Sequence, residues 1–295
     1  MKAPDFIYHR ASSVQEAVQL LDEYDGNARI LAGGQSLIPM LNMRLWRPSA
    51  LIDINRIEGL DAVSAQGHET VLGARVRYNV IEHSALIAQR LPLLTNMIRY
   101  VGDRQVRHRG TVGGSLVQGD PTGEMPLAAL TLGAKVKVVS VKGEREIPLT
   151  SFYEGSYATV LEPNEMVVSV IYPKHPPFYA FCEMNRRHND FAVVSVAVAG
   201  EIDEQGHWQD VRIGMGGVNE SPMLATDAAS LLNGSRMTDE DIAQAAQLAC
   251  AQADPPDDIR ASGEYRLHLL NAYVRKALGN LRREASSAFS KSPVN

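Results

Sequence analysis

The sequence has very few cysteines: Cys182 and Cys250 are the only two among 295 residues. Two thiols exclude a scaffold stapled by several disulfides, and they exclude an iron–sulfur cluster held by four thiolates of this chain. Aromatic residues make up 6% of the sequence, which leaves little for stacking on nucleic-acid bases. Any redox role of this chain would therefore need a non-metal cofactor.

Basic charge and long apolar runs are also scarce. The chain has 29 Lys and Arg against 34 Asp and Glu, a net charge of -5, whereas a nucleic-acid footprint needs a strongly basic face. No apolar run approaches the ~18 residues that a membrane span needs. The first six residues lack the apolar core of a signal peptide. We expect a cytoplasmic chain with no nucleic-acid partner and no membrane span.

Several motifs of nucleotide and metal sites are missing. Neither G-x-G-x-x-G nor G-x-x-x-x-G-K-S/T occurs, so the fingerprints of nicotinamide-type Rossmann domains and of P-loops are absent. The eight histidines show no H-E-x-x-H or other ligand spacing. We therefore expect no metal site, and the sequence offers no convincing acid–base pair that would mark a catalytic residue.

Helical and strand-like patterns alternate in an order that indicates two domains, as the chain length also suggests. Residues 28–32 fit a buried strand, a glycine loop and a short helix follow, and 51–54 fit a second strand, which together indicate a compact α/β unit. Residues 173–177 contain three prolines and form the best domain boundary. Beyond it, we expect strands over 178–184, 192–199 and 211–215, then helices over 238–253 and 264–278.

Two glycine pairs occur in similar settings, within residues 32–37 and 112–116. A Gly-Gly pair lets the backbone approach a ligand closely and permits positive φ. The first pair lies between a strand and a helix, so its N–H groups could converge on an anion. Two such loops could hold both phosphates of a pyrophosphate, and the alternative is that each is only a tight turn. A third cluster, Gly214–Gly217, is interpreted as a turn at a strand end.

Four motifs in register suggest a family. They are Ile30–Pro39, Arg109–Ser115, Gly119–Pro126 and Arg186–Ala192. Together they resemble the FAD-binding medium subunit of molybdenum hydroxylases, a family that includes the flavoprotein subunits of carbon monoxide dehydrogenase and of N-heterocycle oxidoreductases, and the central part of xanthine dehydrogenase. The resemblance covers nearly the whole chain, from Phe6 to about Leu278.

The resemblance implies an α+β fold. A two-lobed FAD-binding domain of the PCMH/VAO type would span 1–175, with sublobes at about 1–56 and 57–175. A smaller C-terminal domain of the carbon monoxide dehydrogenase flavoprotein type, with an antiparallel sheet and helices, would span 176–282. We expect the small, polar residues 283–295 to be a disordered tail.

The resemblance also implies where FAD binds. Segments 32–36 and 111–115 would wrap the pyrophosphate through backbone amides and hydroxyls, and a β-branched side chain at either glycine pair would fill that space. Asp120 and Glu124 would contact the ribityl and ribose hydroxyls, and residues 190–191 would reach the isoalloxazine ring. The full set of expected cofactor-binding residues is Ala32, Gly33, Gly34, Gln35, Ser36, Leu37, Thr111, Val112, Gly113, Gly114, Ser115, Asp120, Glu124, Val167, Asp190 and Phe191.

Some of these residues have simpler explanations that stay open at this point. Glu124 could be an acid favoured by the dipole at a helix N-terminus, Phe191 could be a core residue, and Val167 could be a buried strand residue. Many relatives have Tyr where this chain has Phe191, so we expect ring packing there and no role for a hydroxyl. The basic run 104–109 could face phosphate, a partner or solvent.

The function implied by the resemblance is electron transfer within a larger enzyme. A molybdopterin-binding large subunit would oxidise the substrate, a 2Fe–2S small subunit would relay the electrons, and this chain would pass them through FAD to an external acceptor. The assembly would be a dimer of heterotrimers. One alternative is a self-contained flavoenzyme of the same superfamily, which needs a proton donor that we do not find in the sequence. Another is a non-catalytic nucleotide-binding module.

Overall fold

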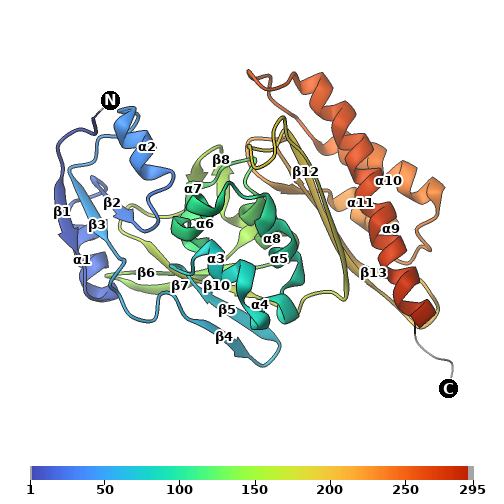
Figure 1. The fold of residues 1–295 in the computed structure, drawn as a ribbon, viewed down its shortest axis with the longest axis horizontal. Helices are drawn as coiled ribbons and strands as arrows, with labels where there is room; N and C mark the ends of the chain where they lie inside the picture. The colour runs from blue at the N-terminus through green and yellow to red at the C-terminus, as the bar shows by residue number, and fades with distance from the viewer. Residues whose placement is uncertain (1, 292–295) are drawn as a thin grey trace. The chain divides into compact units, whose positions relative to one another are not determined.

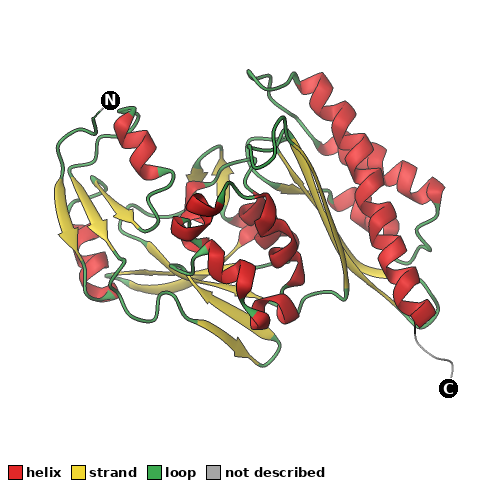
Figure 2. Cartoon of the chain, viewed as in Figure 1, coloured by secondary structure: helices red, strands yellow, loops and turns green. Residues whose placement is uncertain are grey.

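The computed structural model describes residues 2–291, which form two compact units built from several chain segments each. Unit 1 comprises the described residues up to Ala88, together with Gly102–Gly119 and Gly133–Pro173. Unit 2 comprises Gln89–Val101, Asp120–Leu132 and the described residues from Lys174 onward. Helices and strands occur in both units, as the expected α+β class requires (Figure 2).

The first sheet of unit 1 has three parallel strands in the order β1-β3-β2. Helix α1 buries Ala17, Val18 and Leu21 in a core that also contains Ala28 and Ile52 of the sheet. The expected order of strand, glycine loop, helix and strand is therefore confirmed. The elements are β1 (Ile7–Arg10), α1 (Val14–Glu23), β2 (Ala28–Leu31), α2 (Leu37–Asn42) and β3 (Ala50–Asp53).

The second sheet of unit 1 is antiparallel, with five strands in the order β4-β5-β10-β6-β7. In β6 the side chains of Val136 and Val138 are buried, whereas Lys135 and Lys137 form ion pairs on the other face, as the alternating pattern requires. The strands are β4 (Val63–Gln66), β5 (Glu69–Gly73), β6 (Lys135–Ser140), β7 (Gly143–Pro148) and β10 (Met166–Tyr172), with a separate pair β8 (Tyr153–Gly155) and β9 (Ala158–Thr159).

Short helices connect these strands of unit 1. They are α3 (Tyr78–His83), α6 (Arg104–Arg109), α7 (Val112–Gln118) and the 3-10 helix η2 (Leu149–Ser151), while α4 (Ala85–Arg90) crosses the division between the units. Helix α7 ends at Gly119, whose φ of 63° is in the left-handed region that favours glycine.

Unit 2 is built on an antiparallel sheet in the order β11-β12-β13-β14, with helices on both faces (Figure 1). Along β12, Val194, Val196 and Val198 belong to the core that includes α9, α10 and α11, and the residues between them are also buried. A strand that is covered on both faces is apolar throughout instead of alternating. The elements are β11 (Phe178–Met184), β12 (Val194–Ile202), β13 (Trp208–Gly216), β14 (Met223–Leu224), α5 (Pro92–Met97), η1 (Ile98–Tyr100), α8 (Glu124–Thr131), α9 (Thr226–Leu232), α10 (Asp239–Gln252) and α11 (Gly263–Lys291).

Helix α8 explains why residues 120–132 belong to unit 2, although they precede the expected domain boundary. All eight of its residues are buried, and the helix packs on β12 and β13. A Cβ atom on Gly214 of β13 would collide with Thr131 Oγ1 and come within 2.9 Å of Leu127 Cδ1. The interpretation of 214–217 as a turn is wrong for Gly214–Gly216, because glycine there lets α8 lie directly on the strand.

The C-terminal helix is longer than the sequence analysis expected. The expectation that 283–295 is disordered is wrong for 283–291, which are part of α11, and 292–295 lie outside the described residues. Leu281 and Ala285 are buried at helical spacing, which extends the apolar face of α11 beyond Leu278.

Candidate functional site

The first glycine loop of unit 1 presents a row of unpaired backbone donors. It connects β2 to α2, and Gly34 adopts a φ of +73°, which glycine accommodates without strain. Among the described residues, no acceptor takes a hydrogen bond from the N–H groups of Gly33, Gly34, Gln35 or Ser36. Successive free N–H groups in a loop form a concavity that suits an anion. The loop therefore fits the pyrophosphate of a dinucleotide.

The second glycine loop differs, because its backbone donors are already used. The N–H groups of Val112 and Gly113 bind the carbonyls of Val76 and Ala74 at 3.0 and 2.8 Å. The N–H of Gly114 binds Thr111 Oγ1 at 3.2 Å, as in an N-terminal cap of α7. These hydrogen bonds attach the loop to the chain before α3. The groups of this loop that could still hydrogen-bond a ligand are therefore mainly side chains, such as the hydroxyl of Ser115.

The two glycine loops lie against each other. A Cβ atom on Gly33 would collide with the carbonyl oxygen of Arg109 and come within 3.2 Å of Gly110 Cα. Arg109 and Gly110 directly precede the second loop. Glycine at position 33 is thus required by a contact between loops. This reason differs from the expected one, which was space for the pyrophosphate.

Two residues that the sequence analysis missed connect these loops. Asn55, which follows β3, donates from Nδ2 to the carbonyl of Ala32 at 2.9 Å. The Arg77 guanidinium donates to Asn55 Oδ1 and to the carbonyl oxygen of Arg109. Asp53 Oδ1 accepts hydrogen bonds from both nitrogens of Asn55 at 2.7 Å. The polar residues Asp53 and Asn55 at the end of a buried strand are the only local sequence signal for this cluster. Arg77 reaches them only through the tertiary fold.

Positive charge accumulates beside the free amides of the first loop. The pKa of Arg77 is lowered by burial first, and then by the neighbouring cations Arg109 and Arg75. A bound anion would stabilise the charged form of the Arg77 guanidinium, which these neighbouring cations disfavour. Arg107, by contrast, is buried and pairs with Glu82 at 3.0 Å. Of the basic run 104–109, Arg109 therefore lies near the loop, and Arg107 has a structural role.

The remaining expected site residue of unit 1 is Val167. It lies in β10 and is buried, opposite Val138 of β6. The ladder between these strands shifts register directly after it, between Val167 and Ser169. Its burial agrees with the simpler explanation of a core strand residue. Nothing in unit 1 requires a cofactor to account for it.

The other four expected site residues lie in unit 2, and two of them share a carboxyl-rich region. Asp120 Oδ1 accepts from the N–H and Oγ1 of Thr122 at 2.8 and 2.7 Å. Glu124 opens α8 and is only 9% exposed. Burial, followed by the charge of Asp120, raises the pKa of Glu124 to about 7. Half-protonated near neutral pH, Glu124 can both donate and accept hydrogen bonds.

A further carboxyl group, which the sequence analysis missed, lies beside Glu124. Burial and the charge of Glu124 raise the pKa of Glu183, in β11, to about 8. Asn185 Nδ2 donates to Glu183 Oε1 at 2.9 Å, while Glu183 Oε2 is buried with no partner among the described residues. Unit 2 therefore contains two carboxyl groups, on Glu124 and Glu183, whose pKa values are both raised mainly by burial.

The segment around Asp190 and Phe191 is exposed on unit 2. Asp190 Oδ1 accepts from the N–H of Phe191 at 2.8 Å. The Phe191 side chain is 55% exposed, so it is not a core residue, and the alternative of core packing is wrong. The Arg260 guanidinium lies 4.7 Å from the centre of its ring. An exposed aromatic ring of this kind suits stacking against a ligand.

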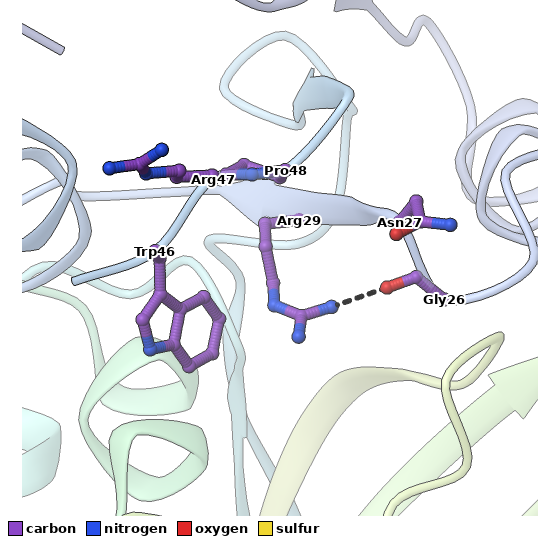
Figure 3. Close-up of a pocket in the computed structure, with 6 residues that line it drawn as sticks. All are labelled: Gly26, Asn27, Arg29, Trp46, Arg47 and Pro48. Atoms are coloured by element: carbon purple, nitrogen blue, oxygen red, sulfur yellow. Dashed lines mark hydrogen bonds between the residues drawn. The ribbon is translucent and has the colours of Figure 1, made fainter. Parts of the chain in front are cut away.

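A separate pocket of about 240 Å³ lies in unit 1 (Figure 3). Arg29 and Trp46 face each other in it, with the guanidinium 4.3 Å from the indole ring. The pocket is at the N-terminal end of β2, whereas the first glycine loop follows the C-terminal end of that strand. Gly26, Asn27, Arg47 and Pro48 complete its lining.

The described residues contain neither a metal-binding cluster nor a membrane-spanning helix. Within residues 2–291, no group of three or more His, Cys, Asp or Glu side chains is placed to hold a metal ion. No helix in that range is long and apolar enough to cross a membrane.

Two family models together match nearly the whole chain. Residues 4–175 match the FAD binding domain in molybdopterin dehydrogenase. Residues 179–281 match the CO dehydrogenase flavoprotein C-terminal domain. The first match alone covers more than half of the chain.

Individual proteins are similar over nearly their full length. The chain is 37% identical to the 6-hydroxypseudooxynicotine dehydrogenase complex subunit alpha of Paenarthrobacter nicotinovorans, over 94% of this chain and 95% of that one. It is 34% identical to the carbon monoxide dehydrogenase medium chain of Hydrogenophaga pseudoflava, with coverage of 94% and 97%.

Solved structures of such proteins have the same fold. A carbon monoxide dehydrogenase from Hydrogenophaga pseudoflava matches with a TM-score of 0.92 and 34% identity, over 95% of this chain and 98% of the other. Quinoline 2-oxidoreductase from Pseudomonas putida 86 matches with a TM-score of 0.91 and 35% identity, with coverage of 97% and 99%.

Proposed function

This chain belongs to the family of FAD-binding medium subunits of the molybdenum hydroxylases, and we propose from that premise that it carries electrons between two partners through FAD. The electrons would come from a 2Fe–2S small subunit, after a molybdopterin-binding large subunit has oxidised the substrate. This chain would then transfer the electrons to an external acceptor. The proposed complex is cytoplasmic and is a dimer of heterotrimers.

The observation that carries this proposal is the row of four N–H groups from Gly33 to Ser36, which find no acceptor in the described part of the chain and lie next to Arg77 and Arg109. A dinucleotide pyrophosphate has two negative charges and several acceptor oxygens. Amides that donate to no other group and nearby guanidinium cations complement both properties. Backbone amides bind phosphate without the conformational cost of ordering long side chains.

The other expected residues would act on the remaining parts of the cofactor. Ser115 and Thr111 supply hydroxyls from the second loop. Asp120 and Glu124 supply carboxyl oxygens for hydroxyls of the ribityl chain and ribose, and the raised pKa of Glu124 lets it serve as donor or acceptor. Phe191 supplies an exposed aromatic face for the isoalloxazine ring.

The chemistry that bound FAD supplies is the conversion between one-electron and two-electron transfer. The residues of this chain would bind the cofactor, orient it and shield it from solvent. No residue of this chain is assigned to substrate chemistry, because the substrate would be oxidised on another subunit. The domain boundaries that we propose are 1–175 for the FAD-binding domain and 176–282 for the C-terminal domain.

The role of the first loop can be tested through Arg77. Arg77→Gln removes the bridge between Asn55 and Arg109 together with one cation. We expect FAD affinity to fall about tenfold to hundredfold, since charge-assisted hydrogen bonds contribute roughly 1.5–3 kcal/mol. FAD affinity is measured by the quenching of flavin fluorescence on titration of the full-length apoprotein.

A matched control is available in the same unit. Arg145 pairs with Glu165 through Nε and Nη2 at 2.7 and 2.8 Å, on the second sheet. Arg145→Gln removes an arginine that also makes hydrogen bonds within unit 1, and it should leave FAD affinity unchanged. Equal FAD affinity of the Arg77 variant and the wild type would contradict the assignment of this loop to the pyrophosphate.

A further inference from the structure

Arg29 lines the pocket of unit 1 without an anionic partner. It lies in β2, where the alternation of a strand turns Ala28 and Ile30 toward the core under α1 and Arg29 toward the other face. In the described part of the chain, no carboxylate forms an ion pair with Arg29 or with Arg47, which also lines the pocket. Burial lowers the pKa of Arg29, and no neighbouring acid raises it again. A half-buried cation without a counter-charge is unfavourable.

The guanidinium of Arg29 is held in one orientation. Its Nη1 donates to the carbonyls of Gly26 and Ala28, both at 2.9 Å. Its central carbon lies 4.3 Å from the centre of the Trp46 ring system (Figure 3). Stacking of this kind uses the face of the guanidinium and leaves its in-plane N–H groups able to donate. A ligand therefore meets a side chain that is already ordered, which lowers the entropy cost of binding.

Several hydrogen-bond donors of the pocket have no acceptor within residues 2–291. Arg29 Nε is buried without a partner, and Arg29 Nη2 donates to no described group. The backbone N–H groups of Trp46 and Arg47, which are adjacent in the chain, also find no described acceptor. Buried donors in native proteins are almost always paired. Unpaired donors that surround a pocket therefore indicate an acceptor from outside the chain.

The lining and the size of the pocket define the class of ligand. Besides the two arginines and Trp46, the lining consists of Gly26, Asn27 and Pro48, so it contains no acidic side chain. Cations and N–H donors without competing carboxylates favour an oxyanion. The volume of about 240 Å³ is below the roughly 300–1,000 Å³ of pockets for drug-sized ligands. The ligand is therefore a small molecule.

We propose that this pocket binds the oxyanion of a small molecule, a carboxylate or a phosphate group, with Arg29 as its main binding residue and Arg47 as a second cation. The inference goes beyond the proposed function. The pocket is at the N-terminal end of β2, whereas the first glycine loop follows the C-terminal end. At roughly 3.3 Å per strand residue, the two sites are about 10 Å or more apart, so the anion bound here is not the pyrophosphate.

Trp46 makes the pocket directly observable. The chain has two tryptophans, and the other, Trp208, is buried in the core of unit 2. In the isotope-labelled full-length chain with excess FAD, the two indole N–H resonances are followed by NMR while phosphate or acetate is added. A sodium chloride titration of equal ionic strength is the reference. We expect a saturable shift of the Trp46 resonance and none of the Trp208 resonance. A shift with phosphate identifies a phosphate ligand, and a shift with acetate alone identifies a carboxylate.

Three variants test the assignment to Arg29. Arg29→Gln should weaken binding of the anion about tenfold or more, because it removes a charge-assisted hydrogen bond. Arg44→Gln is the matched control, since Arg44 is an exposed cation just after α2 that does not line the pocket. Affinity in that protein should change less than about twofold, because salt screens exposed charges. Arg47→Gln changes an exposed residue and keeps the test decisive if Arg29→Gln does not fold. It should weaken binding more than Arg44→Gln does.

Two results would overturn the inference. One is a Trp46 resonance that responds to chloride as strongly as to phosphate and acetate. The other is an equal loss of affinity in the Arg44→Gln and Arg47→Gln proteins, which would show a general attraction of anions to basic side chains. A chain that binds no FAD would contradict the proposed function and leave this inference intact, because the pocket requires no flavin.

Discussion

The contact between the two glycine loops predicts the consequence of a single methyl group at position 33. In Gly33→Ala the new Cβ would collide with the carbonyl oxygen of Arg109 and lie 3.0 Å from its carbon and 3.2 Å from Gly110 Cα. Ordinary contacts between carbon atoms are roughly 3.5–4.0 Å. All of these atoms belong to the backbone, so the loops must move apart by about 0.5–1 Å, because no side chain can rotate away.

The expected magnitude follows from comparable overpacking in protein cores. Forcing an extra methyl group into a packed site costs about 1–3 kcal/mol. We therefore expect the apoprotein to lose about that much free energy of unfolding. We also expect FAD affinity to fall about tenfold or more, because each 1.4 kcal/mol corresponds to a factor of ten and the free amides of the first loop would shift relative to Arg77.

The assay compares unfolding of the apoprotein by urea with FAD affinity from flavin fluorescence. Gly114→Ala is the matched control, since its Cβ would be within 4 Å only of Thr111 Oγ1, at 2.7 Å, a side-chain atom that can rotate. Its effect on apoprotein stability should be smaller. If Gly33→Ala abolished FAD binding but left the stability of the apoprotein unchanged, Gly33 would serve only to make space for the ligand, and the argument from the loop contact would be refuted.

Three other substitutions have defined outcomes. Gly279→Ala, inside α11 with no heavy atom within 4 Å of the new Cβ, should raise the free energy of unfolding by about 0.5–1 kcal/mol in urea titrations, and destabilisation would show that the position is constrained. Glu183 has a pKa raised to about 8, so the folded chain keeps a proton that the unfolded chain loses, and stability falls as pH rises from about 4.5 to 8. Glu183→Gln apoprotein should therefore gain up to about 4 kcal/mol on the wild type between pH 5 and pH 8.5, and parallel pH profiles would exclude this titration. Arg266→Leu should cost about 3–5 kcal/mol, because it leaves the carbonyls of Val193 and Gly217 without the buried Arg266 side chain as their donor. A melting temperature equal to that of the wild type would show that these hydrogen bonds do not stabilise the fold.

The sequence was sufficient for the family, the fold class and the cofactor, all of which the comparisons confirm. Local patterns carried most of this information. The strand, glycine loop and helix around Gly33 follow from buried strand residues and a loop that requires positive φ at Gly34. The alternating valines of β6 were likewise predictable, because one face of the strand is buried and the other is charged.

What the sequence did not indicate depends on tertiary contacts. Gly214 resembles a turn residue in the sequence, and only the packing of α8 on β13 shows why glycine is required in a strand. The two glycine loops look alike, yet only the first keeps its N–H groups free, because Ala74 and Val76 occupy those of the second. Arg77 has no local signal, since its partners lie 22 and 32 positions away.

The raised pKa values of Glu124 and Glu183 likewise depend on tertiary structure. Glu124 could be selected from the sequence because it opens a helix within a recognisable motif. Glu183 is an isolated acid in an apolar strand, and its raised pKa depends on the burial that unit 2 provides and on the charge of Glu124. A pKa shift that comes from burial is a property of the fold and is not visible in local sequence.

The central claim is that this chain supplies the FAD through which electrons leave a molybdenum enzyme. The most direct test is to purify the full-length chain with the partners it binds in its own cell, and to measure flavin, iron and molybdenum per chain. The account predicts one FAD per copy of this chain, together with iron from the 2Fe–2S small subunit and molybdenum from the large subunit. A complex that contained molybdenum and iron but no flavin on this chain would contradict it.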